Sequence, residues 1–265
     1  MKKVALAVAV VLGFVVVQPV QAADNKALVI IDSYFDSKVA ASNIKCITPT
    51  NTNCVTTSVT SPSLSNAVNH GNAMAEVAKK QNSTLPIILL QSAFVSAKSV
   101  NEVNAGNFID ALNWVNKNSN TIGAVSVSRF FNGNVGCSPA AVNTAPYGGV
   151  QKADATIRSL IVTLKSKNIP VFVSTGNTPG TKIDYPACIP DTVSVGTGSL
   201  NSAGVLVSVH ALNNETDYVG DYSINNFSSP VLGLIPHTTS SATVAVATQY
   251  LVNGQLPTKV VKINR

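Results

Sequence analysis

Four polar residues in this chain of 265 residues carry the groups that hydrolysis by a serine nucleophile needs. Ser240 has a hydroxyl, His70 has an imidazole that can take its proton, and Asp32 has a carboxylate that can orient the imidazole. Asn177 has an uncharged amide, whose N–H can donate to a developing negative charge. In such a reaction the hydroxyl is the nucleophile, the imidazole is the general base and later the general acid, and the carboxylate orients the imidazole. Nearby N–H groups form the oxyanion hole.

The strands and helices that must position these residues indicate an α/β fold. Residues 27–31 form a continuous apolar segment that ends in Asp32, as is typical of a buried parallel strand. Similar segments predict strands at 85–91, 123–128, 170–174 and 192–196, and apolar spacing predicts helices at 104–115, 157–168 and 240–251. This alternation predicts a single-domain, doubly wound parallel sheet, which binds ligands at the carboxyl edge of its strands. The Asn- and Gly-rich residues 132–136 and 213–226 are expected to be surface loops.

The motifs around the four residues resemble, in the same order, the catalytic elements of the subtilisin-like serine proteases. They are Ile30–Ser33, His70–Ala75, Val173–Asn177 with Tyr185–Cys188 downstream, and Thr238–Ala247. The resemblance implies a subtilisin-like catalytic domain over residues 23–265. It also implies the activity of an exported serine endopeptidase, with Asp32, His70 and Ser240 as triad and Asn177 in the oxyanion hole.

The resemblance further implies where a polypeptide substrate binds. Residues 108–114 and 125–128 resemble the family's helix and following strand, whose edge pairs with extended substrate. The implied substrate-binding residues are Ser128, Arg129, Phe130, Ser174, Thr175 and Gly176. The chain departs from the family pattern at Phe130 and Thr238, which replace glycines, and at Val244, which replaces a proline. A phenylalanine in place of that glycine could obstruct the approach of a peptide backbone.

Two other functions remain open at the level of sequence. The first is a non-catalytic relative that binds peptides or a partner protein through the same cleft. It is favoured by Arg129 and Phe130, by Thr238, and by the short interval between Ala22 and Asp32, into which no propeptide fits. The second is an exported α/β binding protein for small molecules, but such proteins usually have two lobes, for which this chain is short.

The N-terminus predicts export. Lys2 and Lys3 precede the apolar segment Val4–Val17, and small residues end at Ala22, so we interpret residues 1–22 as a signal peptide. A membrane anchor is the alternative, but the apolar segment is shorter than a spanning helix needs. We expect a secreted or periplasmic monomer without a stable anchor after cleavage. The formal charge of +6 includes both lysines, and no Lys/Arg run exceeds two residues, which argues against nucleic-acid binding.

The four cysteines are expected to form two disulfides, because an exported chain meets an oxidising environment. Of the three pairings, we favour Cys46 with Cys54, which closes a short loop, and Cys137 with Cys188. A zinc site is the competing interpretation, but there is no CxxC pair and the three histidines are scattered. We expect no cofactor. The nine Asp and three Glu form no dense cluster that would mark calcium, and calcium binding is left open.

Overall fold

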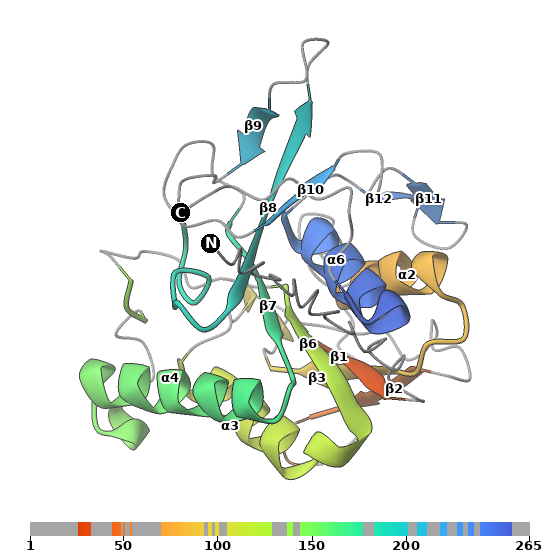
Figure 1. Cartoon of the computed structure of the whole chain (residues 1–265). Coiled ribbons are helices and arrows are strands. Elements are labelled where there is room, and N and C mark those ends of the chain that lie inside the picture. The colour runs from red at the N-terminus through yellow and green to blue at the C-terminus, as the bar shows by residue number, and fades with distance from the viewer. Residues whose placement is uncertain are drawn as a thin grey trace, which may run out of the picture.

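A parallel β-sheet runs through the centre of the molecule, with helices on both faces (Figure 1). The structure is a computed structural model that describes residues 26–32, 44–48, 50, 54, 70–92, 95–96, 99–100, 105–128, 137–139, 144–176, 183–200, 206–210, 218–221, 227–229, 233–235 and 239–255. The predicted signal peptide therefore lies outside the described residues.

Seven strands of the sheet are parallel, in the order β10-β8-β7-β6-β1-β3-β2, and β9 pairs with β8 in the antiparallel direction. The strands are β1 (Ala27–Asp32), β2 (Ile44–Ile47), β3 (Ile87–Gln91), β6 (Ile122–Val127), β7 (Val171–Ser174), β8 (Val193–Leu200), β9 (Leu206–His210) and β10 (Tyr218–Asp221). Two short pairs lie apart from it: β4 (Val95–Ser96) with β5 (Ser99–Val100), and β11 (Phe227–Ser229) with β12 (Gly233–Ile235). The prediction of a doubly wound parallel sheet is confirmed.

The two faces of the sheet are covered by different helices. The helices are α2 (His70–Gln81), α3 (Ala105–Lys117), α4 (Val150–Ser166) and α6 (Thr239–Asn253), with short 3-10 turns at Ser119–Thr121 and Ala145–Tyr147. In β1, Val29 and Ile31 pack with α3 and α4, whereas Leu28 and Ile30 pack with α2 and α6. Since side chains alternate between faces along a strand, Asp32 at the end of β1 belongs to the α2 and α6 face.

Helix α6 is buried on all sides at its N-terminal end. Residues 239–248 are all buried, and the helix contacts α2 and strands β1, β6, β7, β8 and β10. Figure 1 shows α6 beside α2 on one face of the sheet. The small side chains at its start, such as Ser241 and Ala242, allow this close packing. None of the helices in the described part of the chain combines the length and apolar character needed to cross a membrane.

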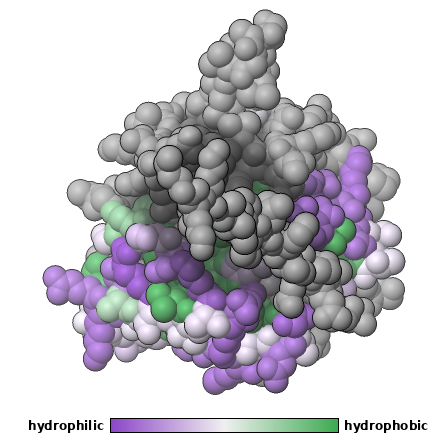
Figure 2. Space-filling model, in the orientation of Figure 1, coloured by the Kyte–Doolittle hydropathy of each residue, from purple (hydrophilic) through white to green (hydrophobic). Residues whose placement is uncertain are grey.

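The described surface is mainly polar. Figure 2 shows hydrophilic residues over the side where α3 and α4 lie, with smaller hydrophobic areas between them. Among the described residues, Val162 and Val252 are the exposed large hydrophobic side chains.

The sequence-based boundaries were wrong at several places, and two of them have a clear physical reason. Residues 213–226, expected to be a loop, contain strand β10, whose Tyr218 and Val219 pair with Val195 and Gly196. A four-residue strand is too short to stand out among the surrounding Asn and Gly residues. Helix α4 ends at Ser166 and not at Asn168, because Asn168 has a φ of 58°, in the left-handed region that ends helices.

The strand order places a switch point beside β1. After β1 the chain forms β2 and β3 on one side of it, and then crosses to form β6, β7, β8 and β10 on the other side. In open α/β sheets, ligands bind at the carboxyl ends of the strands next to such a reversal. That location is where Asp32, at the end of β1, and Ser128, directly after β6, lie.

Candidate active site

Asp32 and His70 form a hydrogen-bonded pair at the switch point. The Asp32 Oδ2 atom lies 2.7 Å from His70 Nδ1. Asp32 is fully buried at the end of β1, while His70 is the first residue of α2 and its side chain is 22% exposed. Because an ionised carboxylate only accepts, we assign the proton of the neutral imidazole to Nδ1. Its Nε2 atom then has a lone pair available to take a proton.

Ser92 supports Asp32 from the neighbouring strand. Its backbone N–H donates to the Asp32 carbonyl oxygen at 3.0 Å, and its hydroxyl donates to the same oxygen at 3.3 Å. Ser92 follows β3, which pairs with β1 up to Asp32 and Gln91. The backbone that carries the carboxylate is therefore held in place. Sequence reasoning missed Ser92, because a serine after a strand is too common to stand out.

Ser240 lies at the start of α6, above the end of β6. It is the second residue of the helix and 1% exposed, and its hydroxyl donates to the Ser128 carbonyl oxygen at 2.8 Å. The Ser128 N–H donates in turn to the Ile31 carbonyl oxygen at 3.2 Å, next to Asp32. Ser240 is thus tied to the strand beside the Asp32–His70 pair. In the described structure its hydrogen goes to this carbonyl and not to His70.

The end of β7 lies one strand farther from β1. Ser174, Thr175 and Gly176 are buried there, and the Thr175 N–H donates to the Val195 carbonyl oxygen at 3.1 Å. Gly176 has a φ of 108°, which side chains with a Cβ rarely adopt. The structure therefore brings these three predicted substrate-binding residues to the same edge as Ser128. The predicted residues Arg129, Phe130 and Asn177 lie outside the described residues.

Several hydroxyl groups near this edge are buried without a hydrogen-bond partner. They are those of Ser126, Ser128, Ser174, Thr175 and Thr197. An unsatisfied buried hydroxyl typically costs about 1–3 kcal/mol, so proteins rarely retain several of them in one region. Four of the five belong to the carboxyl ends of β6 and β7, where a polar ligand could satisfy them. Sequence patterns could not reveal this, because Ser and Thr are abundant throughout the chain.

Asp184 is a charged residue next to this edge that sequence reasoning did not single out. Its N–H donates to the Thr175 carbonyl oxygen at 2.9 Å, and its carboxylate lies against Gly176. Burial raises the pKa of this carboxyl above its usual value. The signal that could have found it is its position directly before the Tyr185–Cys188 motif.

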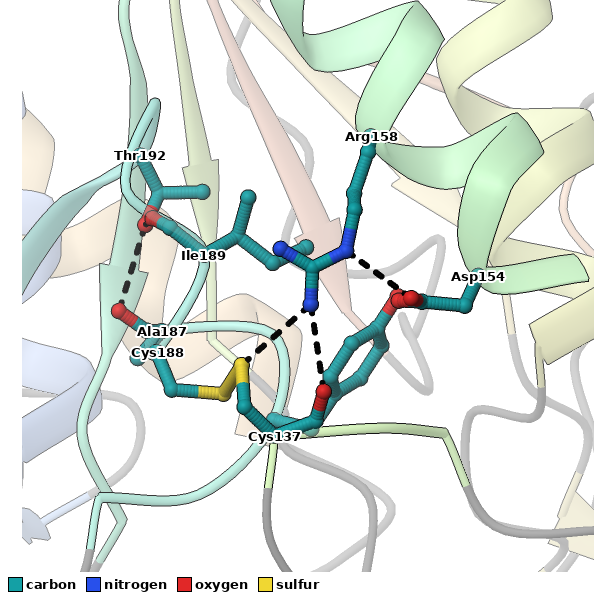
Figure 3. The surroundings of a disulfide bond; sticks show 8 residues. Cys137, Asp154, Arg158, Ala187, Cys188, Ile189 and Thr192 are labelled. Carbon is teal, nitrogen blue, oxygen red and sulfur yellow. Dashed lines mark hydrogen bonds and ion pairs between the residues drawn. A yellow bond between two sulfur atoms is a disulfide. The ribbon is translucent and has the colours of Figure 1, made fainter. Parts of the chain in front are cut away.

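A disulfide fixes the segment that follows Asp184. Cys137 and Cys188 are bonded, as the sequence predicted, and lie 51 positions apart in the sequence. Figure 3 shows Arg158 beside this bond: its guanidinium donates to Asp154 Oδ2 at 2.8 Å and to the Cys137 carbonyl oxygen at 3.1 Å. The Tyr185 hydroxyl donates to Asp154 Oδ1 at 2.9 Å, and burial raises the pKa of Tyr185. Helix α4 therefore anchors both ends of the disulfide.

Cys54 is also disulfide-bonded. The side chain of Cys46, its predicted partner, lies outside the described residues. Within the described ranges, no three His, Cys, Asp or Glu side chains come together as they would around a metal ion.

Solved structures with the same fold include proteases. The chain is similar to the prenylagaramide maturation protease PagA, with a TM-score of 0.57 and 14% identity over 88% of this chain and 76% of that one. It is also similar to the nisin leader peptidase NisP from Lactococcus lactis, with a TM-score of 0.55 and 12% identity over 88% and 78%. The PatG macrocyclase, solved with a peptide, gives a TM-score of 0.58 and 10% identity over 86% and 75%.

The chain has the subtilisin-like fold. No family model and no curated protein sequence matches it. At 10–14% identity, the shared feature is the arrangement of strands and helices.

Proposed function

We propose that this protein is an exported serine endopeptidase that hydrolyses peptide bonds in polypeptide substrates. The observation that carries the proposal is the 2.7 Å hydrogen bond between Asp32 and His70, one strand away from the serine at the start of α6. A fully buried carboxylate bonded to a partly exposed imidazole is the arrangement that makes histidine a general base. The fold shared with proteases, and the peptide bound to PatG, support a polypeptide substrate.

In the proposed reaction, Ser240 Oγ attacks the carbonyl carbon of the substrate and His70 Nε2 takes its proton. Asp32 holds the imidazole and stabilises its positive charge. His70 then gives the proton to the leaving amine as the C–N bond breaks, which leaves an acyl group on Ser240. A water molecule, deprotonated by His70, hydrolyses this ester by the same steps in reverse order.

The developing oxyanion needs donors close to Ser240. The first four N–H groups of a helix have no partner within the helix, and the Ser240 N–H is among them. The second proposed donor is the Asn177 side chain, which follows Gly176 in the sequence. Ser174, Thr175 and Gly176, together with Ser128, Arg129 and Phe130, are the proposed peptide-binding residues. Neither donor role nor binding role requires a metal or cofactor.

One observation favours a second function, a non-catalytic peptide-binding protein. The Ser240 hydroxyl is buried and donates to the Ser128 carbonyl oxygen, which cannot act as a base. A catalytic Ser240 must rotate away from this carbonyl towards His70. A binding protein would have no need of that rotation.

A phosphonate probe for serine hydrolases separates the two functions. We expect the purified protein to be labelled, and Ser240→Ala to abolish labelling while circular dichroism shows a retained fold. Ser159→Ala, at an exposed position on α4, is the matched control and should label like the wild type. Folded wild-type protein that neither labels nor cleaves unfolded polypeptides would favour the binding protein.

Export and oligomeric state are tested on the same preparation. Mass spectrometry of the protein secreted by its host should show a mature chain that begins near Ala23. Size-exclusion chromatography with light scattering should show a monomer. The Cys137–Cys188 bond supports the export proposal, because such bonds persist in oxidising compartments.

A further inference from the structure

The Asp184 carboxylate lies in direct contact with the peptide-binding edge. A methyl group placed on Gly176 would overlap Asp184 Oδ2, so the carboxylate occupies the space that a side chain at residue 176 would fill. The Asp184 N–H donates to the Thr175 carbonyl oxygen at 2.9 Å, which fixes the backbone of Asp184 beside that of Thr175. The disulfide at Cys188 and the Tyr185–Asp154 hydrogen bond hold the residues that follow Asp184. The position of the carboxylate is therefore built into the fold.

This carboxylate has no partner in the described structure. The other aspartates whose side chains are described all have one: Asp32 has His70, Asp110 has Tyr147, Asp154 has Arg158 and Asp191 has Lys165. Asp184 is partly buried and forms neither a hydrogen bond nor an ion pair through its side chain. Burial without compensation raises its pKa. An unpaired, partly dehydrated carboxylate is costly to the folded chain and attractive to a cation.

The distance from Asp184 to Ser240 suits a long side chain. The edge carries, in spatial order, Asp32 at the end of β1, Ser128 after β6, and Ser174 to Gly176 at and after the end of β7, with the Asp184 carboxylate against Gly176. Neighbouring strands are about 4.8 Å apart and Gly176 lies two residues beyond the strand end, so the carboxylate lies roughly 5–10 Å from Ser128, to which the Ser240 hydroxyl is bonded. A lysine or arginine side chain can place its charged end this far from a backbone held at Ser240.

The route between the two residues is polar. The Ser174 and Thr175 hydroxyls are fully buried and have no hydrogen-bond partner. Both belong to the two residues that precede Gly176, so they lie on the same strand end that the carboxylate contacts. Ammonium and guanidinium groups require hydrogen-bond acceptors, and the hydroxyl oxygens and the carboxylate are such acceptors. An apolar side chain would leave these acceptors unpaired.

We propose that Asp184 determines substrate specificity, by binding the Lys or Arg side chain that precedes the peptide bond cleaved at Ser240. This inference rests on the proposed function. Asp184 is a binding residue in this scheme and takes no part in bond cleavage. Substrates with an acidic residue at the same position would meet the carboxylate and be rejected.

The test compares peptides that differ only in the residue before the cleaved bond: Arg, Lys, norleucine or Glu. A hydrogen-bonded charge typically contributes enough to change kcat/KM by about 10-fold to 100-fold. We expect the wild type to prefer Arg and Lys over norleucine by that factor. Asp184→Asn should bring the ratio close to one by slowing the basic peptides far more than the norleucine peptide. Asp191→Asn, which removes the exposed partner of Lys165, is the control and should keep the preference.

Equal cleavage of the Arg and norleucine peptides by the wild type, or an unchanged ratio in Asp184→Asn, would overturn the inference and leave the proposed function standing. If the wild type cleaves none of the peptides, the proposed function fails. The role of Asp184 is then tested by isothermal titration calorimetry, which measures peptide binding to the Ser240→Ala variant. Tighter binding of the Arg peptide that disappears in Ser240→Ala/Asp184→Asn supports cation recognition by Asp184, and equal binding of both peptides overturns it.

Discussion

The Ser240 hydroxyl donates a 2.8 Å hydrogen bond to the carbonyl oxygen of Ser128, a residue 112 positions earlier in the chain. This bond seats the start of α6 on the end of β6, and the Ser128 N–H continues the connection to Ile31 beside Asp32. This bond gives the serine proton to Ser128 and not to His70. A peptide at the edge would have to shift this proton before Ser240 could attack.

Asp32→Asn should lower kcat/KM by about 10⁴-fold, the order of magnitude known for loss of this carboxylate in serine proteases, whereas KM should change little. The physical reason is that an amide facing His70 Nδ1 no longer keeps the proton on Nδ1, which is what leaves Nε2 free to act as the base. The amide also carries no negative charge to stabilise the imidazolium. Steady-state kinetics on a fluorogenic peptide would measure this. Asp191→Asn serves as the control for removal of an aspartate far from the edge. An Asp32→Asn enzyme within tenfold of the wild type would contradict a catalytic role.

Gly176→Ala should destabilise the protein and reduce activity, because the new methyl group would overlap the Asp184 carboxylate at a positive φ. Gly149→Ala is a matched control. Gly149 has a φ of 92° and a ψ of 178° but has nothing within 4 Å of an added methyl group, so it isolates the backbone cost of about 1–3 kcal/mol. Urea denaturation should show a larger loss of unfolding free energy for Gly176→Ala than for Gly149→Ala. Equal losses would mean that the Asp184 contact does not constrain residue 176.

Replacement of both Cys137 and Cys188 by serine should lower the free energy of unfolding by about 4 kcal/mol. The disulfide links residues 51 apart, and a loop of this length loses that much entropy in the unfolded chain when it is closed. Chemical denaturation under non-reducing conditions measures the change without disturbing the bond of Cys54. A loss below about 1 kcal/mol would show that the Arg158–Asp154–Tyr185 hydrogen bonds hold the segment unaided.

Asp184→Asn should gain stability relative to the wild type as the pH rises. In the folded protein, burial raises the pKa of Asp184 above 3.8, so ionisation favours the unfolded chain. The wild type therefore loses stability from this group as the pH rises from 3.8 through the raised pKa, and asparagine does not. Melting temperatures of both proteins between pH 3 and pH 7 would show the difference growing with pH. A variant that is less stable only at pH 7 would indicate a cation partner for Asp184 in the folded state.

Much of the fold could be predicted because its signals are local. The continuous apolar segment before Asp32 and the helical spacing of Ile157, Ile161 and Leu164 depend only on neighbouring residues. Strand β10 escaped prediction because four residues between Asn- and Gly-rich stretches carry little periodicity, and its partner β8 supplies the hydrogen bonds. The Cys137–Cys188 bond was one of three pairings that the sequence allowed, and the position of both residues beside α4 decided it.

By itself, the sequence determined which groups are present and their order along the chain: the carboxylate of Asp32, the imidazole of His70 and the hydroxyl of Ser240. Only the tertiary structure decided which of them meet. Residues 38 and 112 positions apart are brought into hydrogen bonds because β1 lies between β3 and β6, an order that depends on packing of the whole sheet. The same packing puts the unpaired Asp184 carboxylate against Gly176. Periodic sequence patterns do not encode this contact, because both residues lie between β7 and β8, outside any helix or strand.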